Sequence, residues 1–156
     1  MQDEIRTEAE GVMQWIYDDG GRAADGYTGS AGDCVARAVA IASGRSYADV
    51  YAALARGAGR ERGSRGTSAR NGIHTSRAWF KTYMSQLGFR WTPTMHIGSG
   101  CRVHLTDGEL PNGRLVVAVS RHVTAVLDGV IHDTHDPQRG NRRCVYGYYS
   151  ARQEGA

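Results

Sequence analysis

The chain has 156 residues, of which 40% are hydrophobic and 22% are charged, values typical of one globular domain with its own core. Its formal net charge of +3 is too small to predict nucleic-acid binding. Its longest apolar stretch, Leu115 to Val119, is far too short to span a membrane. We therefore expect a single domain over residues 1–156, with a core from about 30 to 149 and with neither nucleic acid nor a membrane as partner.

Three cysteines, Cys34, Cys101 and Cys144, are an odd and sparse set. Their number and spacing do not predict a disulfide framework. The acidic and polar stretch from Met1 to Glu10 has no apolar signal core. We expect a cytoplasmic protein, because a reducing compartment keeps a single thiol usable.

The clearest helix in chain order begins at Cys34. Ser30, with Asp33 three residues later, is typical of a capping box. The run from Cys34 to Ala42 follows, and Gly44 is a fitting stop. This segment is apolar nearly all round, so we expect a central, buried helix.

Two further helices are predicted on either side of a loop. Ser46 and Asp49 repeat the cap pattern before a helix from Tyr47 to about Ala55, and Thr75 caps another that ends at Leu87. Between them, residues 56–72 are rich in Gly, Ser and Arg and predict a flexible loop. A lid over an active site and a phosphate- or RNA-binding patch are the alternative interpretations of this loop.

From Phe89 onward the pattern changes to strands, and Asp128-Gly129 between two apolar runs is a strong signal for a two-residue hairpin. Helices followed by strands predict an α+β domain, with the helices packed on a C-terminal antiparallel sheet. The expected strands are Phe89 to Met95, Cys101 to Leu105, Leu115 to Ser120, His122 to Leu127, Val130 to His135 and Cys144 to Tyr149.

Cys34 is the candidate nucleophile, because the N–H groups and dipole at a helix N-terminus stabilise a thiolate and can hold a developing oxyanion. A small buried hydrophobic side chain is the alternative interpretation of a free cysteine. The hairpin adds a candidate base. A two-residue turn pairs Leu127 with Val130, and this register brings His122 and Asp133 to one face.

An imidazole beside a carboxylate that orients it is the arrangement of a general base. Asp136 is the rival orienting residue; it falls on the opposite face unless the strand ends at Asp133. A structural hydrogen bond is the alternative role for the His122–Asp133 pair.

A metal site is weakly indicated elsewhere. Cys101 and His104, with His96 nearby, make only half of a zinc motif, and adding Cys144 or His132 is unforced. We predict neither a metal nor a cofactor.

The chain resembles the papain-like cysteine peptidases in these segments. A cysteine opens a central helix, and a sheet follows with His at the head of one strand and Asp on the next. Asp133-Thr134-His135 is similar to the Asn-Ser-Trp run of the papain active-site strand, with Asp in place of Asn. Gly32-Asp33-Cys34 is similar to the start of small bacterial and phage members.

The resemblance implies a papain-like fold and a Cys34–His122–Asp133 triad that cleaves a peptide, isopeptide or amide bond through an acyl enzyme, with Asp133 accepting from the imidazole Nδ1–H. The family usually places an oxyanion-hole Gln six residues before the cysteine, where this chain has Thr28. Thr28, Ser30 or the backbone N–H of Cys34 would take that role. The expected partner is a peptide or protein substrate. A catalytically inactive papain-like binding or inhibitor protein, of phage origin, is the alternative function.

Overall fold

The computed structural model describes residues 11–27, 32–59, 69, 72–96, 98, 100–139 and 143–151. Thr28 and Ser30 lie outside these ranges. The elements are β1 (Trp15–Tyr17), α2 (Cys34–Ser43), α3 (Tyr47–Gly59), α4 (Ala78–Gln86), β2 (Phe89–Pro93), β3 (Arg114–Val119), β4 (His122–Leu127), β5 (Val130–Asp133) and β6 (Val145–Ala151).

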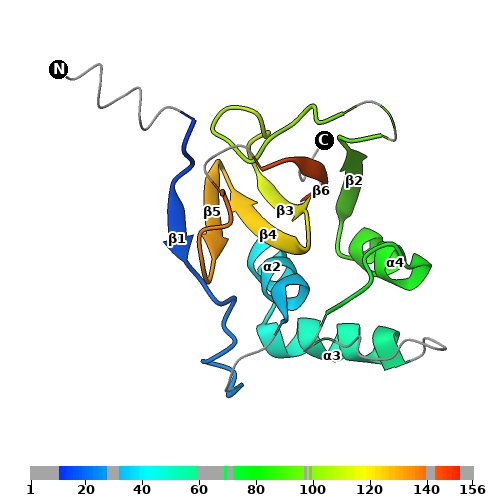
Figure 1. The fold of residues 1–156 in the computed structure, drawn as a ribbon. Helices are drawn as coiled ribbons and strands as arrows, with labels where there is room; N and C mark the ends of the chain where they lie inside the picture. The colour runs from blue at the N-terminus through cyan, green and yellow to red at the C-terminus, as the bar shows by residue number, and fades with distance from the viewer. Residues whose placement is uncertain are drawn as a thin grey trace.

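The strands form one six-stranded sheet in the order β1-β5-β4-β3-β6-β2 (Figure 1). The predicted α+β class is confirmed, but the prediction of an antiparallel sheet is wrong, because β1 pairs in parallel with β5. The amide of Gln138 holds this N-terminal segment by donating to the carbonyl of Met13 at 3.0 Å and accepting from its N–H at 2.7 Å. The sheet is therefore mixed.

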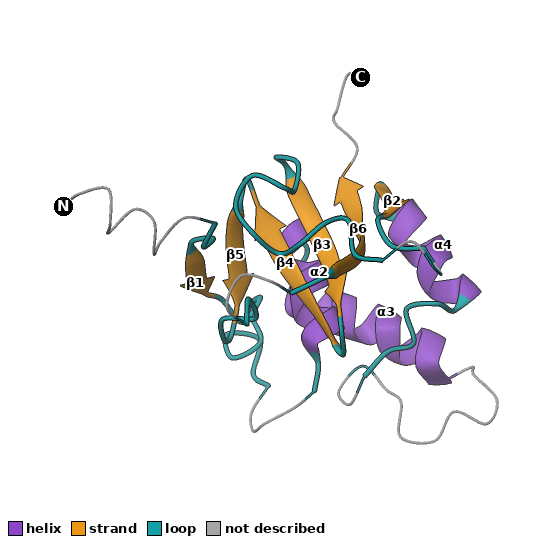
Figure 2. Ribbon diagram, turned by 45° about the horizontal axis from the view of Figure 1, so that its top comes forward, coloured by secondary structure: helices purple, strands orange, loops and turns teal. Residues whose placement is uncertain are grey.

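Helices α2, α3 and α4 lie on one side of the sheet (Figure 2). Their apolar side chains, such as Val39, Leu54 and Phe80, pack with Ala125 and Tyr149 of the sheet in one buried cluster. No helix in the described ranges is both long and apolar enough to cross a membrane. The segment between β2 and β3 crosses the opposite face of the sheet (Figure 2).

A second buried cluster fills the opposite face. Side chains alternate along a strand, so Leu115 and Val117 of β3 face away from the helices, whereas Val116 packs with them. Leu105, from the crossing segment, belongs to the same buried cluster as Val126 of β4. Both faces of the central strands are buried, which gives β3 and β4 their nearly continuous apolar runs.

Helix α2 follows the prediction closely. It begins at Cys34, is buried nearly all round, and ends at Gly44, whose φ of 74° is the left-handed C-cap that glycine favours. The predicted capping box places Asp33 three residues after a cap at Ser30, which lies outside the described residues; the structure instead has Asp33 at the N-cap position itself. Its side chain makes no cap hydrogen bond and instead pairs with Arg37 and Tyr47.

The other helices differ at their ends. Ser46 caps α3 as predicted, by accepting from the N–H of Asp49 at 3.1 Å. However, α3 continues to Gly59, so residues 56–59 of the predicted loop are helical; residues 60–68, 70 and 71 lie outside the described part. Helix α4 begins at Ala78 without a side-chain cap, so the predicted cap at Thr75 is wrong.

The Asp128-Gly129 hairpin has the predicted register. Leu127 pairs with Val130 and Val126 with Ile131, and both turn residues have the positive φ that this turn requires, 48° and 82°. Strand β5 ends at Asp133, two residues earlier than predicted.

The predicted strand from Cys101 to Leu105 is not formed; His104 makes only an isolated bridge with Cys144. Cys101 and Cys144 form a disulfide bond across a sequence separation of 43. The prediction that the cysteines do not form a disulfide framework therefore misses this bond, and Cys34 is the free cysteine. The bond joins the segment that covers the sheet to the residue preceding β6.

Two glycines of α3 offer a matched test of the helical layer. A Cβ at Gly57 would fall on the indole ring of Trp79, whereas one at Gly59 would meet nothing within 4 Å among the described residues. We predict that Gly57→Ala lowers the free energy of unfolding by about 1–3 kcal/mol through overpacking, and that Gly59→Ala leaves it unchanged or slightly higher. Urea denaturation measures both, and equal stability of the two variants would contradict this packing.

Candidate active site

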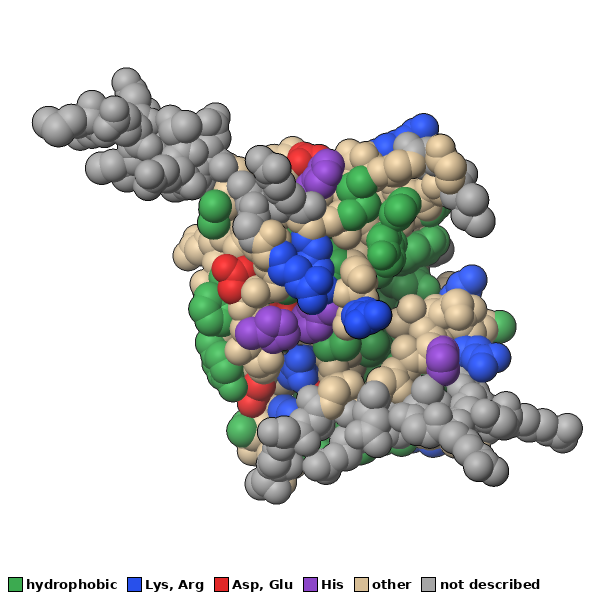
Figure 3. All heavy atoms as spheres, in the orientation of Figure 1, with side chains coloured by type: hydrophobic (Ala, Val, Ile, Leu, Met, Phe, Trp, Pro, Cys, Tyr) green, Lys and Arg blue, Asp and Glu red, His purple; other side chains and the backbone are tan. Residues whose placement is uncertain are grey.

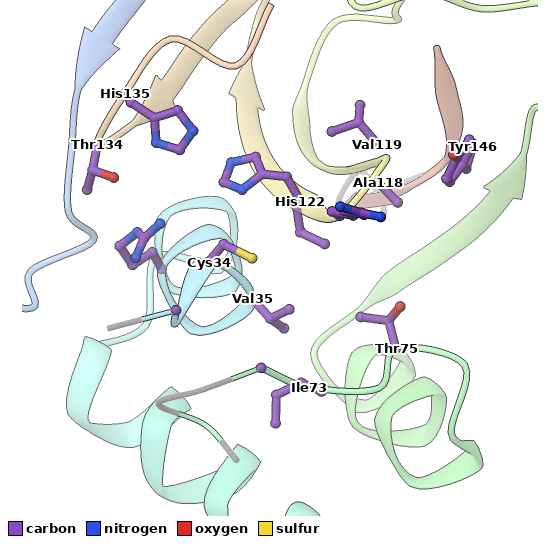
Figure 4. A pocket seen from close by; sticks show the side chains of 15 residues that line it. Cys34, Val35, Ile73, Thr75, Ala118, Val119, His122, Thr134, His135 and Tyr146 are labelled. Atoms are coloured by element: carbon purple, nitrogen blue, oxygen red, sulfur yellow. The ribbon is translucent and has the colours of Figure 1, made fainter. Parts of the chain in front are cut away.

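Cys34 lies at the first turn of α2, at the edge of a cavity of about 690 Å³. The side chain is half-buried and its thiol is free. The sulfur lies next to the imidazole of His122, which is followed by that of His135 (Figure 4). The structure thus brings the predicted nucleophile and base into one cavity.

His122 and Asp133 meet because of the hairpin register. His122 is the first residue of β4 and Asp133 is the last of β5. The imidazole Nε2 lies 2.6 Å from Asp133 Oδ2. The same carboxylate accepts from the hydroxyl of Thr124 at 2.7 Å and from the N–H of Thr134 at 2.7 Å. Asp133 is buried, so these donors replace the water that it has lost.

The ring nitrogen that faces the carboxylate differs from the prediction. Nε2 points to Asp133, not Nδ1, which leaves Nδ1 as the remaining nitrogen for the thiol. Each nitrogen of a neutral imidazole is either a donor or an acceptor, and a partner at one nitrogen fixes the role of the other. Asp133 therefore sets the tautomer in which the nitrogen nearer the backbone serves as base.

Electrostatics favour charge separation between Cys34 and His122. Burial, the largest influence, disfavours the thiolate, but a hydrogen bond and the charge of His122, the Val123 N–H and the charge of Arg37 hold the pKa of Cys34 below its ordinary value. Burial also disfavours the imidazolium, yet hydrogen bonds and charges from Asp133 and Cys34 raise the pKa of His122 to about 9. Both shifts favour a thiolate–imidazolium pair.

The rival carboxylate has another role. Asp136 Oδ1 accepts from the backbone N–H and the side-chain amide of Gln138, at 3.1 and 2.9 Å. It therefore supports the amide that holds Met13 of the N-terminal segment. Between the two candidates, Asp133 is the residue that contacts His122. Burial disfavours the Asp133 carboxylate, but hydrogen bonds from His122 and Thr124 keep its pKa below the usual value.

A second buried carboxylate, absent from the sequence-based site, belongs to Asp33, the residue directly before Cys34. Asp33 pairs with Arg37 and Tyr47, and Arg22 Nε lies 3.1 Å from its Oδ2. Arg37 also reaches towards Asp133 Oδ1, at 3.9 Å. The spacing of Asp33 and Arg37, four residues apart, is the sequence signal that would have indicated this ion pair.

The cavity continues into a second, more apolar one of about 270 Å³. Thr75, Ala118, Val123 and Tyr146 line both cavities. The second cavity also has an aromatic wall, which includes Trp91. A substrate bound at Cys34 would therefore have an apolar recess beside it.

One group of potential metal ligands lies at this site: His122, Asp133 and His135 each offer an atom within 4.8 Å of the others. The 2.6 Å contact between His122 and Asp133 is shorter than the separation of two ligands at about 2.0–2.2 Å from one zinc ion. A metal would have to separate that pair. The weak candidate site at Cys101 and His104 loses its thiolate, because Cys101 is in a disulfide.

Comparisons with protein-family models, with curated proteins and with solved structures found no match to this chain. The chemistry of the site therefore rests on its own geometry.

The lowered pKa of Cys34 predicts how alkylation depends on pH. Iodoacetamide, without reductant, should label Cys34 alone, with a midpoint below the value of about 8.5 for an ordinary thiol. In His122→Ala the midpoint should rise, because burial remains while the stabilising imidazolium is lost. Intact-mass spectrometry across pH measures both, and a parent midpoint at or above 8.5 would contradict an activated thiol.

Proposed function

We propose that this protein is a papain-like cysteine hydrolase that cleaves a peptide, isopeptide or amide bond through an acyl enzyme. The observation that carries the proposal is the meeting of a free thiol and an imidazole in one open cavity, with a buried carboxylate bound to the imidazole. Nucleophilic catalysis by cysteine needs such a thiolate, a proton-carrying base and a group that orients the base.

The proposed reaction has two steps. The Cys34 thiolate attacks the substrate carbonyl, a sulfur–carbon bond forms, and negative charge develops on the carbonyl oxygen. His122, protonated at the nitrogen facing the thiol, gives its proton to the leaving amine as the carbon–nitrogen bond breaks. Water then attacks the thioester with His122 as base, which releases the acid and restores the thiolate–imidazolium pair.

The oxyanion would lie at the N-terminus of α2, where the backbone N–H of Cys34 is a donor without an intrahelical partner. Thr28 and Ser30 remain predicted donors, because they lie outside the described residues. Asp133 acts through His122: it fixes the ring and stabilises its charged form.

A cytoplasmic location also remains a prediction. A reducing compartment would keep Cys34 usable, but it would also tend to open the bond between Cys101 and Cys144, since such bonds persist mainly in oxidising compartments. The disulfide thus favours an environment that is less reducing than the one predicted.

Acylation of the thiol is the direct test of the proposal. A p-nitrophenyl ester should give a burst of p-nitrophenolate and a mass increase on Cys34. Cys34→Ala should abolish the burst, and His122→Ala should slow it by at least about 10³-fold. Acylation of neither Cys34 nor any other residue, together with unchanged binding of a protein partner by Cys34→Ala, would instead support the inactive binding protein.

The pH dependence of turnover tests the roles of the two ionising groups. The active pair exists above the pKa of Cys34 and below that of His122, so kcat/KM should be bell-shaped with its alkaline limb near 9. Asp133→Asn removes the negative charge that raises the pKa of His122, so the alkaline limb should move to lower pH.

Asp136→Asn is the matched control and should leave that limb in place. If the alkaline limb of Asp133→Asn lies at the same pH as that of Asp136→Asn, Asp133 is not the residue that raises the pKa of His122.

A further inference from the structure

We infer that the substrate carries a carboxylate close to its scissile carbonyl and that Arg121 binds it. This inference rests on the proposed function and adds a substrate class to it. It begins with the charges that surround Cys34. The ionisable side chains that line the cavity are Cys34, Arg37, Arg121, His122, His135 and Tyr146, and no described acidic side chain lines it.

Most of the buried charges at the site cancel. The thiolate of Cys34 and the carboxylates of Asp33 and Asp133 are balanced by the cations of Arg22, Arg37 and His122, all of which interact within this group. Arg121 is outside this balanced set. No described residue gives it a hydrogen-bond or ion-pair partner. The cavity therefore has a net positive wall.

The position of Arg121 is structurally constrained. It lies in the two-residue turn between Val119 and His122, which pair with one another, and its φ of 57° is left-handed, a conformation that disfavours a side chain such as Arg. Arg143, itself buried, donates to the carbonyls of Ser120 and Pro137 and so fixes this turn. A strained and anchored position directly before the base places the guanidinium at the cavity.

His135 lies beside His122 in the same cavity. Its imidazole lies 4.8 Å from that of His122, measured between ring centroids, and its side chain is 57% exposed. Its Nδ1 is 3.9 Å from Asp133 Oδ1, too far for a hydrogen bond. In the space-filling view, histidine side chains lie in the middle of this face with Lys or Arg side chains beside them (Figure 3).

A carboxylate is the ligand that this wall fits best. A guanidinium presents a planar set of donors that match the two oxygens of a carboxylate, and hydrogen bonds between charged groups are stronger than neutral ones. Because Arg121 lines the same cavity as Cys34 and His122, a carboxylate bound to it would belong to the molecule whose carbonyl Cys34 attacks. The favoured substrates are therefore acyl compounds or peptides with an acidic group at the cleavage point.

Two alkylating agents that differ in one charge test this inference. Iodoacetate carries a carboxylate and iodoacetamide a neutral amide, and with each agent the Cys34 sulfur–carbon bond forms as iodide leaves. The parent should react with iodoacetate at least as fast as with iodoacetamide. Arg121→Gln should lower the ratio of the two rate constants by roughly tenfold, the effect of losing one charge-assisted hydrogen bond.

Arg121→Lys should retain only part of the ratio, because it keeps the charge but loses the planar pair of donors. Arg90→Gln is the matched control: Arg90 is exposed on β2 and lines neither cavity. It changes the net charge equally and should leave the ratio unchanged. Thermal unfolding of each variant checks that the fold is intact.

An unchanged ratio in Arg121→Gln would overturn the inference. This includes the case in which both rate constants fall by the same factor, because Arg121 would then act on the thiolate and not on a substrate carboxylate. Failure of the proposed function has a different signature: the ratio would depend on Arg121 while the p-nitrophenyl ester fails to acylate Cys34.

Discussion

Both the sheet edge and the candidate site depend on the hydrogen bonds that Asp133 accepts. A buried anion is costly unless several donors surround it, and here those donors come from His122, Thr124 and the backbone of Thr134. The carbonyl of the same residue accepts from the N–H of Asp18 at 2.9 Å and from the indole of Trp15 at 3.3 Å. Strands β1, β4 and β5 therefore converge on one residue, and the base cannot be positioned unless this edge of the sheet has folded.

Arg37 extends this dependence to the helical layer. It lies between two buried carboxylates, paired with Asp33 and 3.9 Å from Asp133, and its charge also favours the Cys34 thiolate. Tyr47, from the next helix, completes the ring around Asp33, and burial together with that carboxylate raises the pKa of its phenol. The buried charges alternate in sign around the head of α2. Loss of any one of them would leave a partner uncompensated, which is the strongly destabilising case.

The sequence was informative where short-range rules apply. The Asp128-Gly129 turn and strict alternation predict the register that joins His122 to Asp133, and Gly44 marks the end of α2. Other features depend on long-range contacts that leave no local signal. The side chains of β1 are all exposed, so its pattern shows no preferred face, and Gln138, more than 100 residues later in the chain, binds Met13 just before it. The cysteines of the disulfide are 43 residues apart, a spacing that by itself predicts nothing. The sequence position of Asp33 suits either a helix cap or an ion pair with Arg37, and the ion pair forms because the side chain is buried.

The tight turn between β4 and β5 also limits how the chain can change its length. His122 and Asp133 are separated by 11 positions along the chain, and their contact exists because both side chains leave the hairpin on one side. Inserting or deleting a single residue within this interval would rotate one of them to the reverse side of the ribbon. A variant that keeps the imidazole–carboxylate contact can therefore have other residues in these strands, but it cannot gain or lose a single residue there.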